Sequence, residues 1–232
     1  MTWIKYIEEP MVKEPIAIVG SPGLRSIGKI AVDYLIEELK PSLVAELYSP
    51  YFPILYQTMP SYVSHPDYPG QAGTLLKGGQ VELPKVEFYL LPFPKLLITK
   101  GYHANFKGQY EVAHQVLDFY QEFGVKKMIV IAGYGREGKD VCCAATDLEF
   151  IRELKEYDID AGYEGPFYGF SGLVFGLGML RDIKGVCLFG RTQPNIEDPE
   201  YPDPKAAKAV LERLSIMLNF TIDLSKLEEK KV

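Results

Sequence analysis

The chain has few of the features that mark membrane, exported or nucleic-acid-binding proteins. No apolar run reaches the roughly 18 to 20 residues that a membrane span requires. The N-terminal stretch MTWIKYIEEP lacks the apolar core and cleavage site of an export signal, so a cytoplasmic protein is expected. Lysine and arginine (25) are outnumbered by aspartate and glutamate (31), and the formal net charge is -6. Because phosphate backbones need a clustered basic face, nucleic acid is not an expected partner.

Cysteine and histidine are equally scarce. The three cysteines, Cys142, Cys143 and Cys187, do not form the C-x-x-C spacing of a zinc or redox site. Cys187 lies in an apolar run and is expected to be buried, whereas a disulfide from Cys142 or Cys143 to another chain stays open. Among the three histidines, His103 is the best placed for chemistry because it follows a predicted strand, but no partner is spaced near it. We therefore predict no catalytic residue, no metal and no cofactor.

What the chain does have is an alternation of short apolar runs and amphipathic stretches. Buried strands are expected at residues 16–19, 43–48, 96–99, 128–132 and 186–189. Helices are expected at residues 27–39, 109–123, 147–157, 172–181 and 204–218. This order predicts an α/β fold with a mostly parallel, doubly wound sheet. We expect one domain over residues 1–223 and a charged, mobile tail over residues 224–232.

The segment 50–94 interrupts this alternation. It is rich in proline, tyrosine and glycine, and it is expected to insert a hairpin whose clearest strand is 86–91. Tyrosine supplies contact area while keeping a polar group. The aromatic residues at and just before its start are therefore predicted to form a protein interface, or alternatively to line a small-molecule pocket under a lid: Tyr48, Tyr51, Phe52 and Tyr56.

The turn after the first buried strand nearly matches a phosphate-binding loop. Gly23 to Lys29 fits G-x-x-x-x-G-K, but the next residue is Ile30, which has no oxygen to bind magnesium. Ser26 is placed as an N-cap, so one interpretation of this helix start is an anion site. The favoured interpretation is that the glycines provide turn geometry and close helix packing.

A second glycine loop, residues 133–138, follows another predicted strand. A lone glycine loop is weak evidence for a ligand. With the first loop it defines a candidate ligand or anion crevice at Gly23, Ser26, Lys29, Gly133, Tyr134 and Thr192.

Four blocks of sequence resemble the proteasome assembly chaperone family, in its archaeal and bacterial branch. They are GSPGLRSIGKIA followed by ELYSPYFP, then MIVIAGYG, then GFSGLVFGLGMLRDIKGVCLFGRT, and finally YPDPKAAKAVLERLSIML. The resemblance implies a three-layer α/β/α domain similar to the phosphorylase/hydrolase-like fold. It also implies self-assembly into a homo-oligomer and contact with proteasome subunits or another assembly factor, without catalysis.

The resemblance leaves two functions to compare. The preferred hypothesis is a non-enzymatic, self-associating, assembly chaperone-like protein. The alternative is a phosphorylase/hydrolase-like enzyme or nucleotide-dependent ligase that uses the crevice near Gly23, Gly133 and Thr192. Some archaeal members of the family dock on the proteasome through a final hydrophobic-Tyr-any motif, whereas this sequence ends Lys230, Lys231, Val232. Any proteasome contact is therefore expected to use the folded surface or to pass through a second protein.

Overall fold

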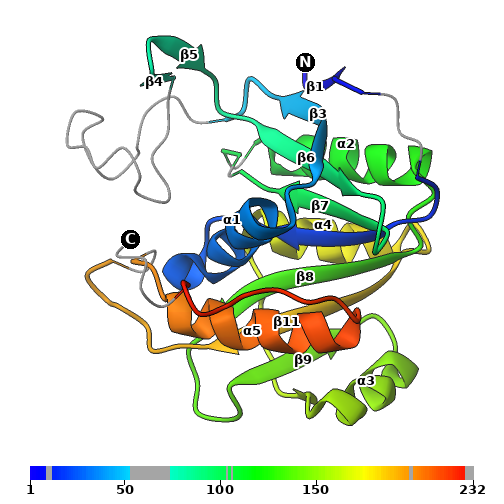
Figure 1. The fold of residues 1–232 in the computed structure, drawn as a ribbon, viewed down its shortest axis with the longest axis vertical. Helices are drawn as coiled ribbons and strands as arrows, with labels where there is room; N and C mark the ends of the chain where they lie inside the picture. The colour runs from blue at the N-terminus through cyan, green and yellow to red at the C-terminus, as the bar shows by residue number, and fades with distance from the viewer. Residues whose placement is uncertain (9–11, 53–73, 103, 106, 199–200, 228–232) are drawn as a thin grey trace.

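A nine-stranded sheet organises the chain in the computed structural model, which describes residues 1–8, 12–52, 74–102, 104–105, 107–198 and 201–227 (Figure 1). The strand order is β1-β3-β6-β7-β2-β8-β11-β9-β10. The strands are β1 (Trp3–Tyr6), β2 (Ile16–Gly20), β3 (Ser42–Tyr48), β6 (Val86–Leu91), β7 (Leu96–Lys100), β8 (Lys127–Tyr134), β9 (Val141–Ala145), β10 (Asp160–Ala161) and β11 (Lys184–Arg191).

The centre of the sheet is parallel. β7, β2, β8 and β11 pair side by side in parallel, and their apolar runs are buried on both faces, as expected for strands covered by helices on each side. Antiparallel strands extend this centre: β1, β3 and β6 on one side, and β9 on the other. The predicted parallel sheet is therefore the core of a larger mixed sheet.

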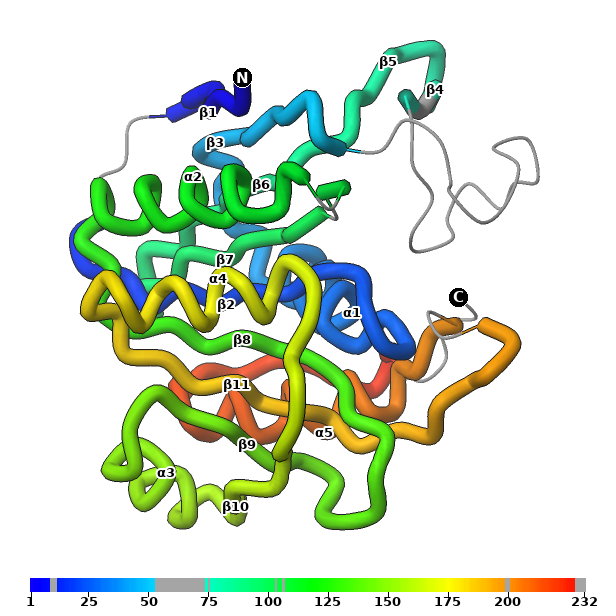
Figure 2. The backbone as a smooth tube through the Cα atoms, turned by 180° about the vertical axis from the view of Figure 1, so that it is seen from behind, coloured from blue at the N-terminus to red at the C-terminus, as the bar shows by residue number. Residues whose placement is uncertain are grey.

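Two layers of helices cover the sheet, which confirms the three-layer α/β/α architecture (Figures 1 and 2). One face packs against α2 (Gln109–Glu122) and α4 (Gly169–Met179), and the opposite face packs against α1 (Ile27–Leu39) and α5 (Pro204–Met217). The short helix α3 (Leu148–Leu154) lies beside β9. Asp147 begins α3 by accepting a hydrogen bond from the Phe150 amide at 2.8 Å.

The segment expected to be an insertion contributes a strand to the main sheet. The strand predicted at residues 86–91 is confirmed as β6, which forms an antiparallel hairpin with β7 and also pairs with β3. A second hairpin, separate from the main sheet, is formed by β4 (Leu75–Lys77) and β5 (Gln80–Glu82). Gly78 and Gly79 join these two strands with φ of 57° and 80°, which glycine adopts without strain.

The C-terminal segment contacts the domain beyond residue 223, the last residue expected to belong to it. Leu227 is buried at 2% exposure among the residues that α1 and α5 cover, and the Tyr34 hydroxyl donates a hydrogen bond to the Asp223 carbonyl. Leu224 and Leu227 therefore pack against the core on this face of the sheet, whereas Ser225 and Lys226 are exposed and residues 228–232 lie outside the described residues. In the described part of the chain, no helix is long and apolar enough to cross a bilayer.

Candidate functional site

A cavity of about 490 Å³ lies beyond the carboxyl ends of β2 and β8, where α4 begins. Crevices at this edge of an open α/β sheet are common ligand sites. Three segments that are distant in sequence form its walls: residues 21–24, residues 131–135 and residues 166–171, with Gly28 and Tyr163 completing it. We call this the β2–β8 cavity.

Two buried serines meet in the wall of this cavity. The Ser21 and Ser171 hydroxyl oxygens lie 2.8 Å apart, and each residue is only 6% exposed. The Ser21 hydroxyl also lies 3.3 Å from the Pro22 carbonyl, to which it can donate. Among the described residues, no histidine or carboxylate forms a hydrogen bond with this pair, so neither serine has the base that activates a nucleophile.

Aromatic rings form another wall. Tyr163 stacks on Phe189 with ring centroids 4.5 Å apart, and Phe167 meets the same ring edge-on at 5.2 Å. Tyr134 donates its hydroxyl to the Lys139 carbonyl at 2.6 Å, and burial raises its pKa to about 12, so the phenol stays protonated at neutral pH. None of the described residues that line the cavity carries a charged side chain.

The residues predicted to form one crevice do not all line the same cavity. Gly23, Gly133 and Tyr134 line the β2–β8 cavity together. Thr192 lies in a second cavity of about 660 Å³, where its hydroxyl donates to the Asp203 carboxylate. That cavity contains opposite charges that pair with one another, such as Arg191 with Asp140 at 2.9 Å.

The phosphate-loop residues do not converge on the cavity. Lys29 pairs with Asp33 one turn along α1 and is not among the residues that line the cavity. Ser26 occupies the N-cap position, but it is fully buried with φ of 51° and its side chain makes no cap hydrogen bond. A Cβ at Gly28 would lie 2.4 Å from the Ile131 carbonyl oxygen, so this glycine permits close helix–strand packing.

The residues predicted to form a protein interface differ in how exposed they are. Tyr48 stacks on Trp3 at 5.6 Å and stays partly exposed, as does Tyr51. Phe52 is only 5% exposed because it packs edge-on against Tyr102 at 5.2 Å, so it belongs to the interior. Tyr56 and His103 lie outside the described residues.

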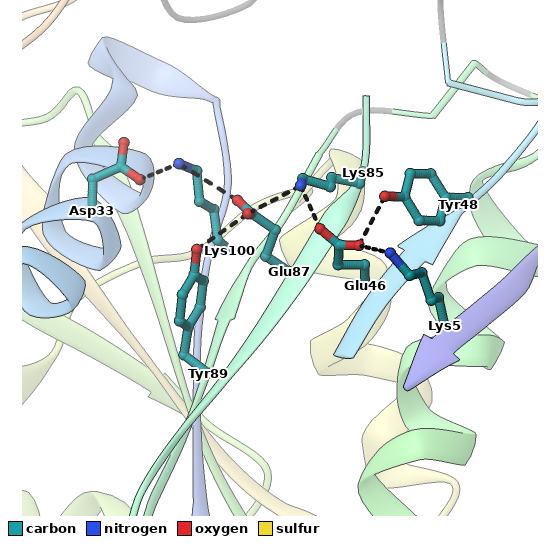
Figure 3. Close-up of polar contacts among 8 residues, drawn as sticks. All are labelled: Lys5, Asp33, Glu46, Tyr48, Lys85, Glu87, Tyr89 and Lys100. Atoms are coloured by element: carbon teal, nitrogen blue, oxygen red, sulfur yellow. Dashed lines mark hydrogen bonds and ion pairs between the residues drawn. The ribbon is translucent and has the colours of Figure 1, made fainter. Parts of the chain in front are cut away.

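A network of ion pairs crosses the sheet near Tyr48 (Figure 3). Glu46 is its centre: it accepts from Lys85, from Lys5 at 3.4 Å and from the Tyr48 hydroxyl at 2.9 Å. Lys85 also lies 3.6 Å from a Glu87 oxygen. Burial by itself would raise the pKa of Glu46, but these hydrogen bonds hold it below its ordinary value.

The cysteines and potential metal ligands show no reactive arrangement among the described residues. Cys142, Cys143 and Cys187 are all free and buried, and no group of three histidine, cysteine, aspartate or glutamate side chains could hold a metal ion. Sequence reasoning missed the residues that shape the cavity most, Ser21, Tyr163, Phe167 and Ser171. For Tyr163, Phe167 and Ser171 the available signal is that aromatic and glycine residues crowd the segment 163–172, and for Ser21 it is the position directly after the first buried strand.

Comparison with known proteins identifies relatives along the whole chain. The PAC2 family model matches residues 17–231. An uncharacterized protein of Methanocaldococcus jannaschii is 30% identical over 231 residues, which cover 96% of this chain and 80% of the relative.

Solved structures agree in fold. The structure of Pyrococcus furiosus PbaB, described as an archaeal proteasome activator, is 32% identical with a TM-score of 0.80, covering 98% of this chain and 93% of that one. Pyrococcus furiosus PbaA, described as an archaeal homolog of proteasome-assembly chaperone, is 22% identical with a TM-score of 0.76, covering 99% and 91%. With a family model matched from residue 17 to residue 231, the chain belongs to the PAC2 family.

Proposed function

We propose that this chain is a non-enzymatic, self-associating protein of the cytoplasm that binds proteasome subunits or a related partner, as an assembly chaperone does. The observation that carries this proposal is the 32% identity to PbaB, an archaeal proteasome activator, over 98% of the chain. A relation of this extent, on one shared fold, supports a shared kind of partner. The resemblance of the four sequence blocks to proteasome assembly chaperones supports the same function.

Helix α4 supports the self-associating part of the proposal. Its sequence, GFSGLVFGLGM, contains no charged residue, although the helix lies on the outside of the sheet (Figure 2). Gly176 is exposed, Met179 is 53% exposed, and Leu180, which follows the helix, is 74% exposed. A helix that is apolar all round is normally buried, and exposed apolar surface often marks a protein contact. A second copy of the chain would cover this surface.

Co-purification tests the proposed partner. The full-length chain, tagged at its N-terminus, is mixed with purified proteasome subunits from its source organism and passed over a sizing column with light-scattering detection. We expect the free chain to elute with a mass that is a multiple of 26.2 kDa and to co-elute with the subunits after mixing. A 26.2 kDa monomer that retains no subunit at micromolar concentration would contradict the proposal.

A surface variant distinguishes specific partner binding from nonspecific charge attraction. Lys5→Glu changes an exposed residue at the edge of the network around Glu46, on the same surface as Tyr48 and Trp3. If subunits bind through the sheet edge, this charge reversal lowers their co-elution. Glu137→Lys, a reversal on an exposed loop near the other end of the sheet, serves as the control. Equal loss in both variants would indicate nonspecific charge attraction.

A further inference from the structure

The β2–β8 cavity has the dimensions and walls of a small-molecule site. Ligand pockets in proteins measure about 300 to 1,000 Å³, are mostly apolar or aromatic, and contain a few polar groups that orient the ligand. This cavity measures about 490 Å³ and meets each of these criteria. Proteasome binding neither requires nor explains it, so the inference goes beyond the proposed function.

The residues that line the β2–β8 cavity limit the charge that a ligand can carry. The cavity contains no charged side chain among its described lining residues, and transfer of an unpaired charge from water into such surroundings is costly. The 660 Å³ cavity around Thr192 does contain charged side chains, and two of them, Arg191 and Asp140, form an ion pair with one another. The β2–β8 cavity therefore favours an uncharged molecule.

The walls also favour an aromatic ligand with a hydrogen-bond donor. Tyr163, Phe167 and Phe170 line the cavity, and aromatic groups pack well against aromatic side chains. A hydroxyl can donate once and accept twice. The contact between Ser21 and Ser171 and the bond to the Pro22 carbonyl leave acceptor positions on both hydroxyls for a ligand N–H or O–H.

We propose that the β2–β8 cavity binds an uncharged, planar aromatic molecule that donates a hydrogen bond to the Ser21–Ser171 pair. The ring lies against the aromatic wall, and the donor group reaches the two buried hydroxyls. Binding involves no covalent step. Occupancy fixes the start of α4 against the ends of β2 and β8, because these three segments form the walls.

Fluorine NMR with matched probes tests this proposal on the full chain. The probe is 4-fluorobenzamide, which has the ring and the N–H donors, and its cationic counterpart is 4-fluorobenzamidine, which has nearly the same shape. We expect saturable binding of the amide and at least about tenfold weaker binding of the cation, since the cavity offers no carboxylate to pair with it. Absence of saturable amide binding, or equal binding of the cation, would overturn the proposal.

Gly23 offers a clean way to block the cavity. Its backbone is extended, with φ of 172°, and a Cβ placed there meets no atom within 4 Å. Gly23→Trp should fill the cavity and weaken amide binding at least about tenfold, whereas Gly23→Ala should bind as the wild type does. Leu148→Trp, at a 72% exposed position on α3, controls for an added surface ring. Unchanged binding by Gly23→Trp with an intact thermal transition would locate the probe elsewhere and refute the site.

Ser171→Ala provides a second variant in case Gly23→Trp does not fold. It removes one hydroxyl and leaves the aromatic wall in place. Loss of one neutral hydrogen bond weakens binding by about three- to tenfold. A Ser171→Ala protein that binds the amide as tightly as the wild type would remove the serine pair from the site and overturn the proposal as stated.

Discussion

Lys100 at the end of β7 forms an ion pair with Asp33 of α1, with 2.8 Å between Nζ and Oδ1 (Figure 3). The same carboxylate pairs with Lys29. Burial would raise the pKa of Asp33, but Lys100 and Lys29 hold it below its ordinary value. Asp33 therefore fixes α1 to the sheet and engages the lysine that, in a phosphate-binding loop, would face a nucleotide.

We expect no magnesium-dependent ATP hydrolysis. Ile30 supplies no oxygen for magnesium, and Lys29 is engaged by Asp33. Phosphate release from ATP by the purified chain should equal that of a buffer blank, and Lys29→Ala should leave it unchanged. Turnover above the blank that disappears in Lys29→Ala would show that the loop binds nucleotide after all.

Gly28→Ala should destabilise the domain by about 2 kcal/mol or more, because its Cβ would lie 2.4 Å from the backbone oxygen of Ile131 and helix α1 would have to move. Gly23→Ala, in the turn before α1, is the matched control and should change the free energy of unfolding by less than about 0.5 kcal/mol. Urea unfolding followed by circular dichroism measures both. Equal stability of the two variants would refute the packing role of Gly28.

Glu46→Gln should cost about 1 to 3 kcal/mol of stability at pH 7, because it removes the buried charge that Lys85 and Lys5 pair with. The folded-state pKa of Glu46 lies below its ordinary value of 4.5. Its contribution is therefore fully present above that value and is lost as the pH falls through the lowered pKa. The difference between wild type and variant should shrink when urea unfolding is repeated at about pH 3.5.

The exposed Glu137 provides the control for this measurement, since Glu137→Gln should change stability little at either pH. A Glu46→Gln deficit of the same size at both pH values would mean that packing, and not the carboxylate charge, carries the effect.

Leu180→Gln should shift the chain toward smaller assemblies. Leu180 is 74% exposed at the end of an uncharged helix, and a polar amide there disfavours burial against a second copy. Leu148→Gln, at an equally exposed position on α3, should leave the assembly unchanged. Light scattering at several concentrations measures the mass of each variant and of the wild type. Identical masses for both variants and the wild type would place the contact surface away from α4.

The three cysteines should react slowly with a thiol reagent in the native state. Burial raises the pKa of Cys142, raises that of Cys143 to about 11, and raises that of Cys187 well above its ordinary value, so little thiolate exists at pH 8. We expect all three to react rapidly in urea and none within minutes without it. Fast reaction of one native thiol would reveal an opening of the β9 side of the sheet.

The sequence by itself determined the elements whose pattern is local. α1 begins and ends where the helical spacing of its apolar residues predicts, at Ile27–Leu39, and β2 follows its β-branched run. The periodicity of apolar residues within each element indicates its type, so short-range spacing is enough to place these two elements. The sequence did not predict β1 or β9: β1 (WIKY) is only four residues long and mostly exposed, and β9 (VCCAA) consists mainly of cysteine and alanine. Both become strands by pairing with β3 and β11.

The tertiary structure alone decided what surrounds each candidate residue. Ser21 and Ser171 are 150 positions apart, and only the approach of α4 to the end of β2 brings their hydroxyls together. The sequence predicts Phe52 as a surface aromatic residue, but Tyr102 packs against it in the interior. The Thr192 backbone does lie beside the second glycine loop, since its amide donates to the Tyr134 carbonyl at 2.9 Å, but its hydroxyl donates to Asp203 in the other cavity. Side-chain environments depend on segments distant in the chain, and no local pattern records which of them will meet.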